Sequence, residues 1–148
     1  MNLEPFRIVL VEDAEPDVFL VREALRQSGL EFELCVLEDG EKAAEFIAGL
    51  DRDQTLPCPD LLLLDLNLPR KDGEQVLARL RQSSRCAHVP VLIVTSSDSP
   101  SDKARAARLG ATEYFRKPSQ LDDFMKLGSL VRHLLETQRQ SSRAQGFG

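Results

Sequence analysis

Aromatic side chains and histidine are scarce here: the 148 residues include no tryptophan, one tyrosine and two histidines. Nucleic-acid-binding proteins usually present a basic face, often with stacking aromatics, whereas this chain carries a net charge of −5. Direct DNA binding is therefore not expected. No apolar run approaches the roughly 20 residues needed to span a bilayer, so no membrane segment is expected either. The opening MNLEPFR lacks the apolar core of a signal peptide, which predicts a cytoplasmic protein.

Cysteine is sparse as well. Cys35, Cys58 and Cys86 show neither CxxC nor Cys/His spacing. An odd, unpatterned set of this kind is typical of neither a disulfide framework nor a zinc site. We therefore predict three reduced thiols.

Strand-like and helix-like segments alternate five times along the chain. The strand-like runs occupy residues 7–13, 32–38, 60–66, 89–96 and 112–117. Near-continuous apolar runs such as LLLL are typical of parallel strands that are buried on both faces. Right-handed crossovers then place helices on both sides of the sheet. The pattern predicts an α/β fold, (βα)5, with an open, doubly wound, five-stranded parallel sheet.

Cap signals mark several helix ends. Pro16 suits the first turn of the first helix, and Gly29 its end. Ser99, Pro100 and Asp102 predict a helix start, and Ser119 with Asp122 repeats that pattern. The last helix carries an apolar stripe to Leu135, interrupted by Gly128. Residues 138–148 show no periodicity and are expected to form a flexible tail.

Polar residues follow the strand-like runs at their carboxyl ends. Because parallel strands point these ends at one edge of the sheet, carboxylates, hydroxyls and an ammonium should converge there. The residues concerned are Glu12, Asp13, Asp65, Thr95, Ser96 and Lys117. Asp65, directly after four leucines, would not be buried without a cationic partner.

This set of side chains predicts phosphoryl-transfer chemistry. Clustered carboxylates repel one another unless a divalent cation is bound, and oxygen ligands without His or Cys suit Mg²⁺. A metal, an ammonium and hydroxyl donors around one carboxylate can stabilise a phosphoryl group in transfer. Asp65 could then act as the nucleophile and form an acyl phosphate.

Five separated motifs, "VED", "LLLLDLNLP", "DG", "VTSS" and "YFRKP", occur in an order that resembles the bacterial response-regulator receiver domain. The resemblance covers residues 7 to about 137, and we assign 5–137 to one receiver domain. It implies a flavodoxin- and CheY-like sheet with strand order 2-1-3-4-5.

The resemblance also implies roles for the residues at the sheet edge. Asp65 would be the phosphoacceptor, and Tyr114 the switch aromatic. The peptide bond between Lys117 and Pro118 would be cis, which X–Pro bonds tolerate. The remaining implied roles are an Mg²⁺ (or Mn²⁺) site at Glu12, Asp13, Asp65 and the backbone carbonyl of Asn67, phosphoryl contacts from Thr95 and Lys117, and tuning of the phosphoryl lifetime by Asn67 and Ser97.

The implied function is that of a single-domain response regulator in a two-component phosphorelay. Its partner would be a sensor histidine kinase or a phosphotransfer protein, and the motif "DLNLPRKDG" resembles the small regulators of phytochrome kinases. That subgroup often dimerises through the fourth helix, fifth strand and fifth helix. Apart from Mg²⁺-dependent self-phosphorylation and autodephosphorylation, no enzymatic activity is expected. His88 and His133 have no motif support as phosphodonors.

Other interpretations stay open at this point. A degenerate receiver would act as a protein-interaction module without phosphorylation, but the full acidic, hydroxyl and lysine set argues against it. A haloacid-dehalogenase-type phosphatase would carry a second acid where Asn67 stands. A nucleotide-binding module would need a glycine-rich loop after the first strand, where DAEPD stands instead. Individually, Asp13 could cap a helix, Thr95 could end a strand, and Lys117 could be a solvated charge.

Overall fold

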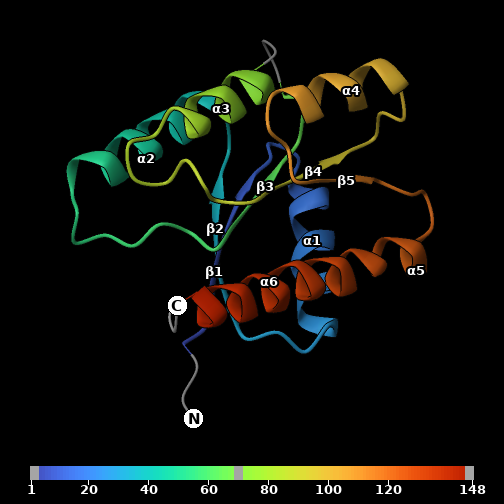
Figure 1. Ribbon diagram of the computed structural model, residues 1–148. Helices are drawn as coiled ribbons and strands as arrows, with labels where there is room; N and C mark the ends of the chain where they lie inside the picture. The colour runs from blue at the N-terminus through green and yellow to red at the C-terminus, as the bar shows by residue number, and fades with distance from the viewer. Residues whose placement is uncertain (1–3, 69–71, 146–148) are drawn as a thin grey trace.

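The computed structural model describes residues 4–68 and 72–145, which form one α/β unit (Figure 1). Its strands are β1 (Phe6–Val11), β2 (Phe32–Leu37), β3 (Leu61–Leu64), β4 (Val91–Thr95) and β5 (Glu113–Arg116). Its helices are α1 (Glu15–Gln27), α2 (Gly40–Arg52), α3 (Asp72–Arg81), α4 (Pro100–Arg108), α5 (Leu121–Phe124) and α6 (Lys126–Gln145).

The five strands are parallel and lie in the order β2-β1-β3-β4-β5, which confirms the predicted fold and strand order. Helices α2, α3 and α4 lie on one side of the sheet, and α1, α5 and α6 lie on the other (Figure 1). From β1 the chain first adds β2 on one side and then adds β3, β4 and β5 on the other, so the connecting helices cover both faces of the sheet. Among the described residues, no helix combines the length and apolar character that crossing a bilayer requires.

Two hydrophobic cores flank the sheet, and successive strand residues alternate between them. Leu62 and Leu64 of β3 pack in the core beneath α2 and α3, whereas Leu61 and Leu63 pack in the core beneath α1 and α6. Each of these leucines is at most 4% exposed. Burying one leucine side chain contributes roughly 1.5–3 kcal/mol, which explains why a run of four leucines forms the central strand.

The predicted start of α4 is confirmed. Ser99 is its N-cap and accepts a hydrogen bond from the backbone N–H of Asp102 at 3.4 Å, and Pro100 follows at the first turn. The repeated pattern at Ser119 was wrong, because the N-cap of α5 is Gln120 and its side chain makes no capping hydrogen bond.

The end of the chain differs from the prediction in two respects. The break in the last helix falls at Met125, and Gly128 lies inside α6. A Cβ atom at Gly128 would collide with the backbone carbonyl of Ala24 in α1. This glycine therefore permits close packing of α1 and α6. Helix α6 continues to Gln145, so helix replaces most of the predicted irregular tail, whose residues 146–148 lie outside the described part.

The prediction of three reduced thiols was wrong. Cys58 and Cys86 form a disulfide with their Cα atoms 5.6 Å apart, and Cys35 is free and exposed. The two cysteines are 28 residues apart in sequence, so no local spacing rule detects them. Because β3 and β4 are neighbours, the loops that precede them meet at the amino-terminal edge of the sheet.

Two arginines bind backbone carbonyls at this same edge. Arg81, at the end of α3, donates to the carbonyls of Ala87, Val89 and Gly110 at 2.6–3.1 Å. Arg85 donates to four carbonyls in the segment that ends α2 and leads toward β3, namely those of Leu50, Asp53, Gln54 and Leu56. Together with the disulfide, these contacts fix the loops before β3, β4 and β5.

Candidate functional site

Asp65 lies at the carboxyl-terminal edge of the sheet, immediately after β3. Its backbone N–H donates to the carbonyl of Val11 at 3.2 Å, which continues the pairing of β3 with β1 past the last leucine. The residue is only 5% exposed. The parallel pairing thus carries a carboxylate to the mouth of the sheet, as the position after four leucines predicted.

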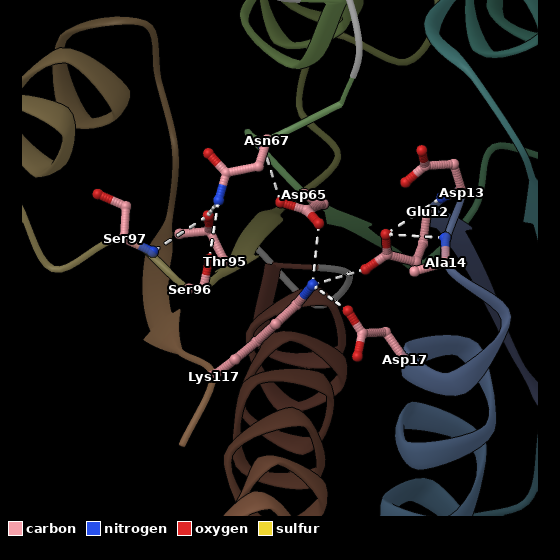
Figure 2. Close-up of polar contacts among 10 residues, drawn as sticks. All are labelled: Glu12, Asp13, Ala14, Asp17, Asp65, Asn67, Thr95, Ser96, Ser97 and Lys117. Carbon is pink, nitrogen blue, oxygen red and sulfur yellow. Dashed lines mark hydrogen bonds and ion pairs between the residues drawn. The ribbon is translucent and has the colours of Figure 1, made fainter. Parts of the chain in front are cut away.

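Lys117 provides the cationic partner that the buried carboxylate requires. It follows β5, and its backbone N–H donates to the carbonyl of Thr95 at 2.7 Å. Its ammonium donates to Glu12 Oε1 at 2.7 Å, Asp17 Oδ2 at 2.7 Å and Asp65 Oδ2 at 2.9 Å. Figure 2 shows the lysine reaching across the sheet edge to a point where the three carboxylates meet. The predicted convergence therefore brings together Glu12, Asp65 and Lys117.

Burial and pairing shift the pKa values of these groups. Burial alone would lower the pKa of Lys117, but its hydrogen bonds to Asp17, Glu12 and Asp65 outweigh that effect and raise the pKa above its ordinary value. Burial raises the pKa of Glu12 to about 7, and the hydrogen bond from Lys117 opposes that rise. Lys117 therefore stays charged, and it compensates an acidic cluster that burial disfavours.

The acidic cluster fits a small divalent cation. One oxygen from each of Glu12, Asp17 and Asp65 lies within 4.8 Å of the others. Carboxylate oxygens without nitrogen or sulfur ligands are the donors that Mg²⁺ and Mn²⁺ accept. Asp13, predicted as a ligand, is exposed and lies outside this cluster, and Asp17 lies inside it.

A second group of polar side chains lies beside Asp65. The side-chain amide of Asn67 donates to Thr95 Oγ1 at 2.9 Å and to Ser96 Oγ at 3.0 Å (Figure 2). The backbone N–H of Asn67 donates to Asp65 Oδ1 at 2.8 Å. Thr95 is fully buried, and its Oγ1 also lies 3.5 Å from the backbone N–H of Ser97. These contacts link the end of β3 to the end of β4.

Tyr114 lies half-buried on β5, next to the segment that follows Thr95. Its phenol donates to the backbone carbonyl of Ser97 at 2.8 Å, and burial raises the pKa of the phenol. The hydroxyl of Ser97 donates to Asp102 of α4 at 2.6 Å. Tyr114 and Ser97 therefore connect the sheet edge to the first turn of α4.

Helix α3 begins directly against the backbone of Asp65. A Cβ atom at Gly73 would come within 2.7 Å of the carbonyl oxygen of Asp65 and 2.9 Å of Leu66 Cα. Any side chain at this position would displace the segment that carries the carboxylate. The glycine of the "DG" motif is therefore required by the close approach of α3 to the backbone of Asp65, and not only by a turn.

Sequence reasoning missed one polar residue of the site, Asp17. Asp17 lies one turn before Val21 and two turns before Ala24, on the buried face of α1. An acid that extends an apolar stripe toward the functional edge was a signal that could have identified it. The cis prediction was also wrong: the bond between Lys117 and Pro118 is trans. X–Pro bonds prefer trans by about 0.5–1 kcal/mol, and nothing in the sequence sets the isomer.

Comparison with known proteins identifies a family that matches most of the chain. Residues 8–128 match the response regulator receiver domain. Response regulator Rcp1 from Synechocystis sp. is 38% identical over 123 residues, which cover 83% of this chain and 84% of that protein.

Solved structures give the same result. The phosphorylated cyanobacterial phytochrome response regulator RcpA superposes with a TM-score of 0.80 at 30% identity, covering 90% of this chain and 96% of that one. The Mn²⁺-bound form of Rcp1 gives a TM-score of 0.78 at 37% identity, with the same coverage. The family match over residues 8–128 includes the residues that form the sheet edge described above.

Proposed function

This chain belongs to the response regulator receiver domain family, and from that premise we propose that Asp65 accepts the phosphoryl group in a two-component phosphorelay. The observation that carries the proposal is the ion pair of Asp65 Oδ2 with Lys117 Nζ at 2.9 Å, at an edge where Thr95 and Asn67 also gather. A buried carboxylate at the end of a strand, paired with an ammonium and flanked by a hydroxyl, suits attack on phosphorus.

The transfer step needs one oxygen of Asp65 as the nucleophile. That oxygen forms a bond to phosphorus while the bond from phosphorus to the donor's histidine nitrogen, or to the carboxylate oxygen of acetyl phosphate, breaks. The bonding electron pair remains on the leaving nitrogen or oxygen. Lys117 and the hydroxyl of Thr95 would then donate to the phosphoryl oxygens, where the added negative charge lies.

A divalent ion is the implied cofactor, and the carboxylates of Glu12 and Asp65 in the acidic cluster fit it. We propose Glu12 and Asp65 as ligands, with the exposed carboxylate of Asp13 and the backbone carbonyl of Asn67 as the further predicted ones. When bound, Mg²⁺ or Mn²⁺ would neutralise negative charge on the phosphoryl oxygens.

Thr95 and Tyr114 would transmit the change. Thr95 Oγ1 is the acceptor in its contact with Asn67, so its own hydrogen remains available for a phosphoryl oxygen. If the hydroxyl turns toward Asp65, that contact must change, and with it the segment from Ser96 to Asp102, which includes the first turn of α4 and binds the phenol of Tyr114 through Ser97. Phosphorylation would thereby shift the equilibrium between two conformations of the surface formed by α4 and β5.

Intact-mass analysis after incubation with Mg²⁺ and acetyl phosphate tests the acceptor. The wild type should gain one phosphoryl group, and Asp65→Asn should gain none, because an amide oxygen is a poor nucleophile. Asp123→Asn, on the exposed pair with Lys126, is the matched control and should react like the wild type. An adduct that persists in Asp65→Asn would place the acceptor elsewhere. Chelation with EDTA should prevent adduct formation in all variants.

The donor proposed for this site is a sensor histidine kinase or phosphotransfer protein. The similarity to the phytochrome response regulator RcpA supports a phytochrome kinase as that donor. We further propose a homodimer through α4, the edge strand β5 and the helices α5 and α6 that follow it. Sedimentation analysis with and without acetyl phosphate tests the dimer. An unchanged monomer under both conditions would exclude a phosphorylation-dependent pair.

A further inference from the structure

We propose that Asp17 is a positioning residue, which keeps the ammonium of Lys117 beside Asp65 throughout phosphoryl acceptance. This inference rests on the proposed function and adds a residue to its machinery. Asp17 belongs to none of the motifs that identified the site, and it lies on α1 within the buried stripe of that helix.

The contacts of Lys117 show why an anchor is needed. An ammonium has three N–H donors, and all three are engaged, with Glu12, Asp17 and Asp65. The lysine stem is long and flexible, so the position of its charge depends on these partners. Loss of a partner would let the ammonium move away from the reacting carboxylate.

Two of the three partners have other tasks in the proposed reaction. Asp65 forms a bond to phosphorus, and Glu12 is a proposed metal ligand. Asp17 forms no bond to phosphorus, and although its carboxylate lies in the acidic cluster, it is not among the ligands proposed for the metal. Among the described residues, Lys117 is the one hydrogen-bond partner of its carboxylate. Asp17 can therefore keep its 2.7 Å contact while Asp65 changes partners.

The position of Asp17 suits a fixed anchor. It lies in the first turn of α1, which begins at Glu15 and packs against the core through Val21 and Ala24. Its side chain is 30% exposed and that of Lys117 is 11% exposed, so the contact is largely shielded from solvent. A charge-assisted hydrogen bond in such surroundings is stronger than one at the surface.

The test compares rates of adduct formation with acetyl phosphate and Mg²⁺. Asp17→Asn should slow the reaction by roughly tenfold, the effect of losing one charge-assisted hydrogen bond in the transition state. Asp17→Glu, which keeps the charge, should recover most of the rate. Glu15→Gln removes an exposed acid from the same helix turn and should leave the rate unchanged.

A double-variant cycle shows whether Asp17 acts through Lys117. If it does, Asp17→Asn should slow the reaction no further in a Lys117→Ala background. Independent, multiplicative effects would overturn the proposal. Equal loss of Mg²⁺ affinity in Asp17→Asn and Glu12→Gln would also overturn it, because Asp17 would then be a metal ligand.

A readout on the metal-free protein does not depend on phosphorylation. The ¹⁵N–¹H signal of the Lys117 ammonium should be observable at neutral pH in the wild type, because three hydrogen bonds slow proton exchange with water. Exchange should become faster in Asp17→Asn and stay unchanged in Glu15→Gln. An unaltered signal in Asp17→Asn would overturn the inference. Failure of the wild type to gain a phosphoryl group would refute the proposed function. The ammonium signal would still test the contact between Asp17 and Lys117, so the two failures can be distinguished.

Discussion

At the amino-terminal edge of the sheet, Arg81 and Arg85 donate to backbone carbonyls, whereas at the opposite edge Lys117 donates to three carboxylates. Both edges hold cations partly removed from water. At the first edge the acceptors are fixed parts of the main chain and carry no net charge. At the second edge the acceptors are side chains that can bind a metal, accept a phosphoryl group or take up a proton.

This difference separates a structural polar network from a functional one. The carbonyl acceptors are neutral main-chain atoms, so the arginine contacts satisfy polar groups of the loops and contribute to stability. The carboxylates around Lys117 repel one another, and their arrangement is stable only while a cation compensates them. The same residue class, a half-buried base, therefore fixes the fold at one edge and leaves the other edge ready for exchange.

The strongest test of this comparison removes the cation from the carboxyl-terminal edge. Lys117→Ala leaves Glu12, Asp17 and Asp65 without their ammonium and should lower the free energy of unfolding of the metal-free protein by about 4 kcal/mol. Added Mg²⁺ should restore much of the loss, because it can replace the missing positive charge. Urea denaturation with and without Mg²⁺, at equal ionic strength, measures both effects.

Lys126→Ala, which removes an exposed ion pair with Asp123, is the control for that measurement. It should change stability by less than about 1 kcal/mol, and Mg²⁺ should make no difference to it. If Mg²⁺ did not restore the stability of the Lys117→Ala variant, the cation at the carboxyl-terminal edge would be no more replaceable than the arginines at the amino-terminal edge.

The next largest effect is expected at the amino-terminal edge, from reduction of the disulfide between Cys58 and Cys86. Opening a loop of 28 residues should lower the free energy of unfolding by about 3.5 kcal/mol through the entropy of the unfolded chain. The gain of a phosphoryl group should be unaffected, because the cross-link lies at the edge away from Asp65. Denaturation and intact mass, each with and without dithiothreitol, measure the two outcomes.

Cys35→Ser controls for reaction of the free, exposed thiol and should behave like the wild type in both conditions. A large loss of phosphorylation on reduction would mean that the two edges are coupled. The contrast between them would then not hold.

A smaller effect is expected from Arg85→Ala. The carbonyls of Leu50, Asp53, Gln54 and Leu56 would lose their charged donor, at a cost of about 2 kcal/mol because part of this set can bind water. Mg²⁺ should not restore this loss. Arg79→Ala, which removes a looser pair with Asp51 at 3.7 Å, should cost less than about 1 kcal/mol. Equal losses in the two variants would show that the carbonyl contacts carry no special stability.

The fold could be predicted because its determinants are local. The apolar run Leu61–Leu64 and the cap at Ser99 act within a few residues, and both were located correctly. The order of the strands followed from the resemblance, since local patterns do not decide which strands are neighbours.

The parts that could not be predicted depend on how distant segments meet. The disulfide follows from the adjacency of β3 and β4, and the role of Gly128 follows from the packing of α6 on α1. Asp17 entered the site because the rotation of α1 about its axis, set by the burial of Val21 and Ala24, turns that face toward the sheet edge. The position of Glu12 and Asp13 after β1 predicted that they lie at the functional edge, but it did not predict that only Glu12 points into the acidic cluster.

One strand carries almost no information about its own alignment. A shift of β3 by one residue would still place leucines opposite most of its neighbours, so packing discriminates weakly between alignments. The polar residues at its two ends do discriminate: Asp60 accepts a hydrogen bond from the backbone N–H of Arg7, and Asp65 meets Lys117. The carboxylate proposed for chemistry therefore also acts as a stop that sets where the central strand lies. Its replacement by a small apolar residue would leave Asp60, at the other end of β3, as the polar residue that sets the alignment.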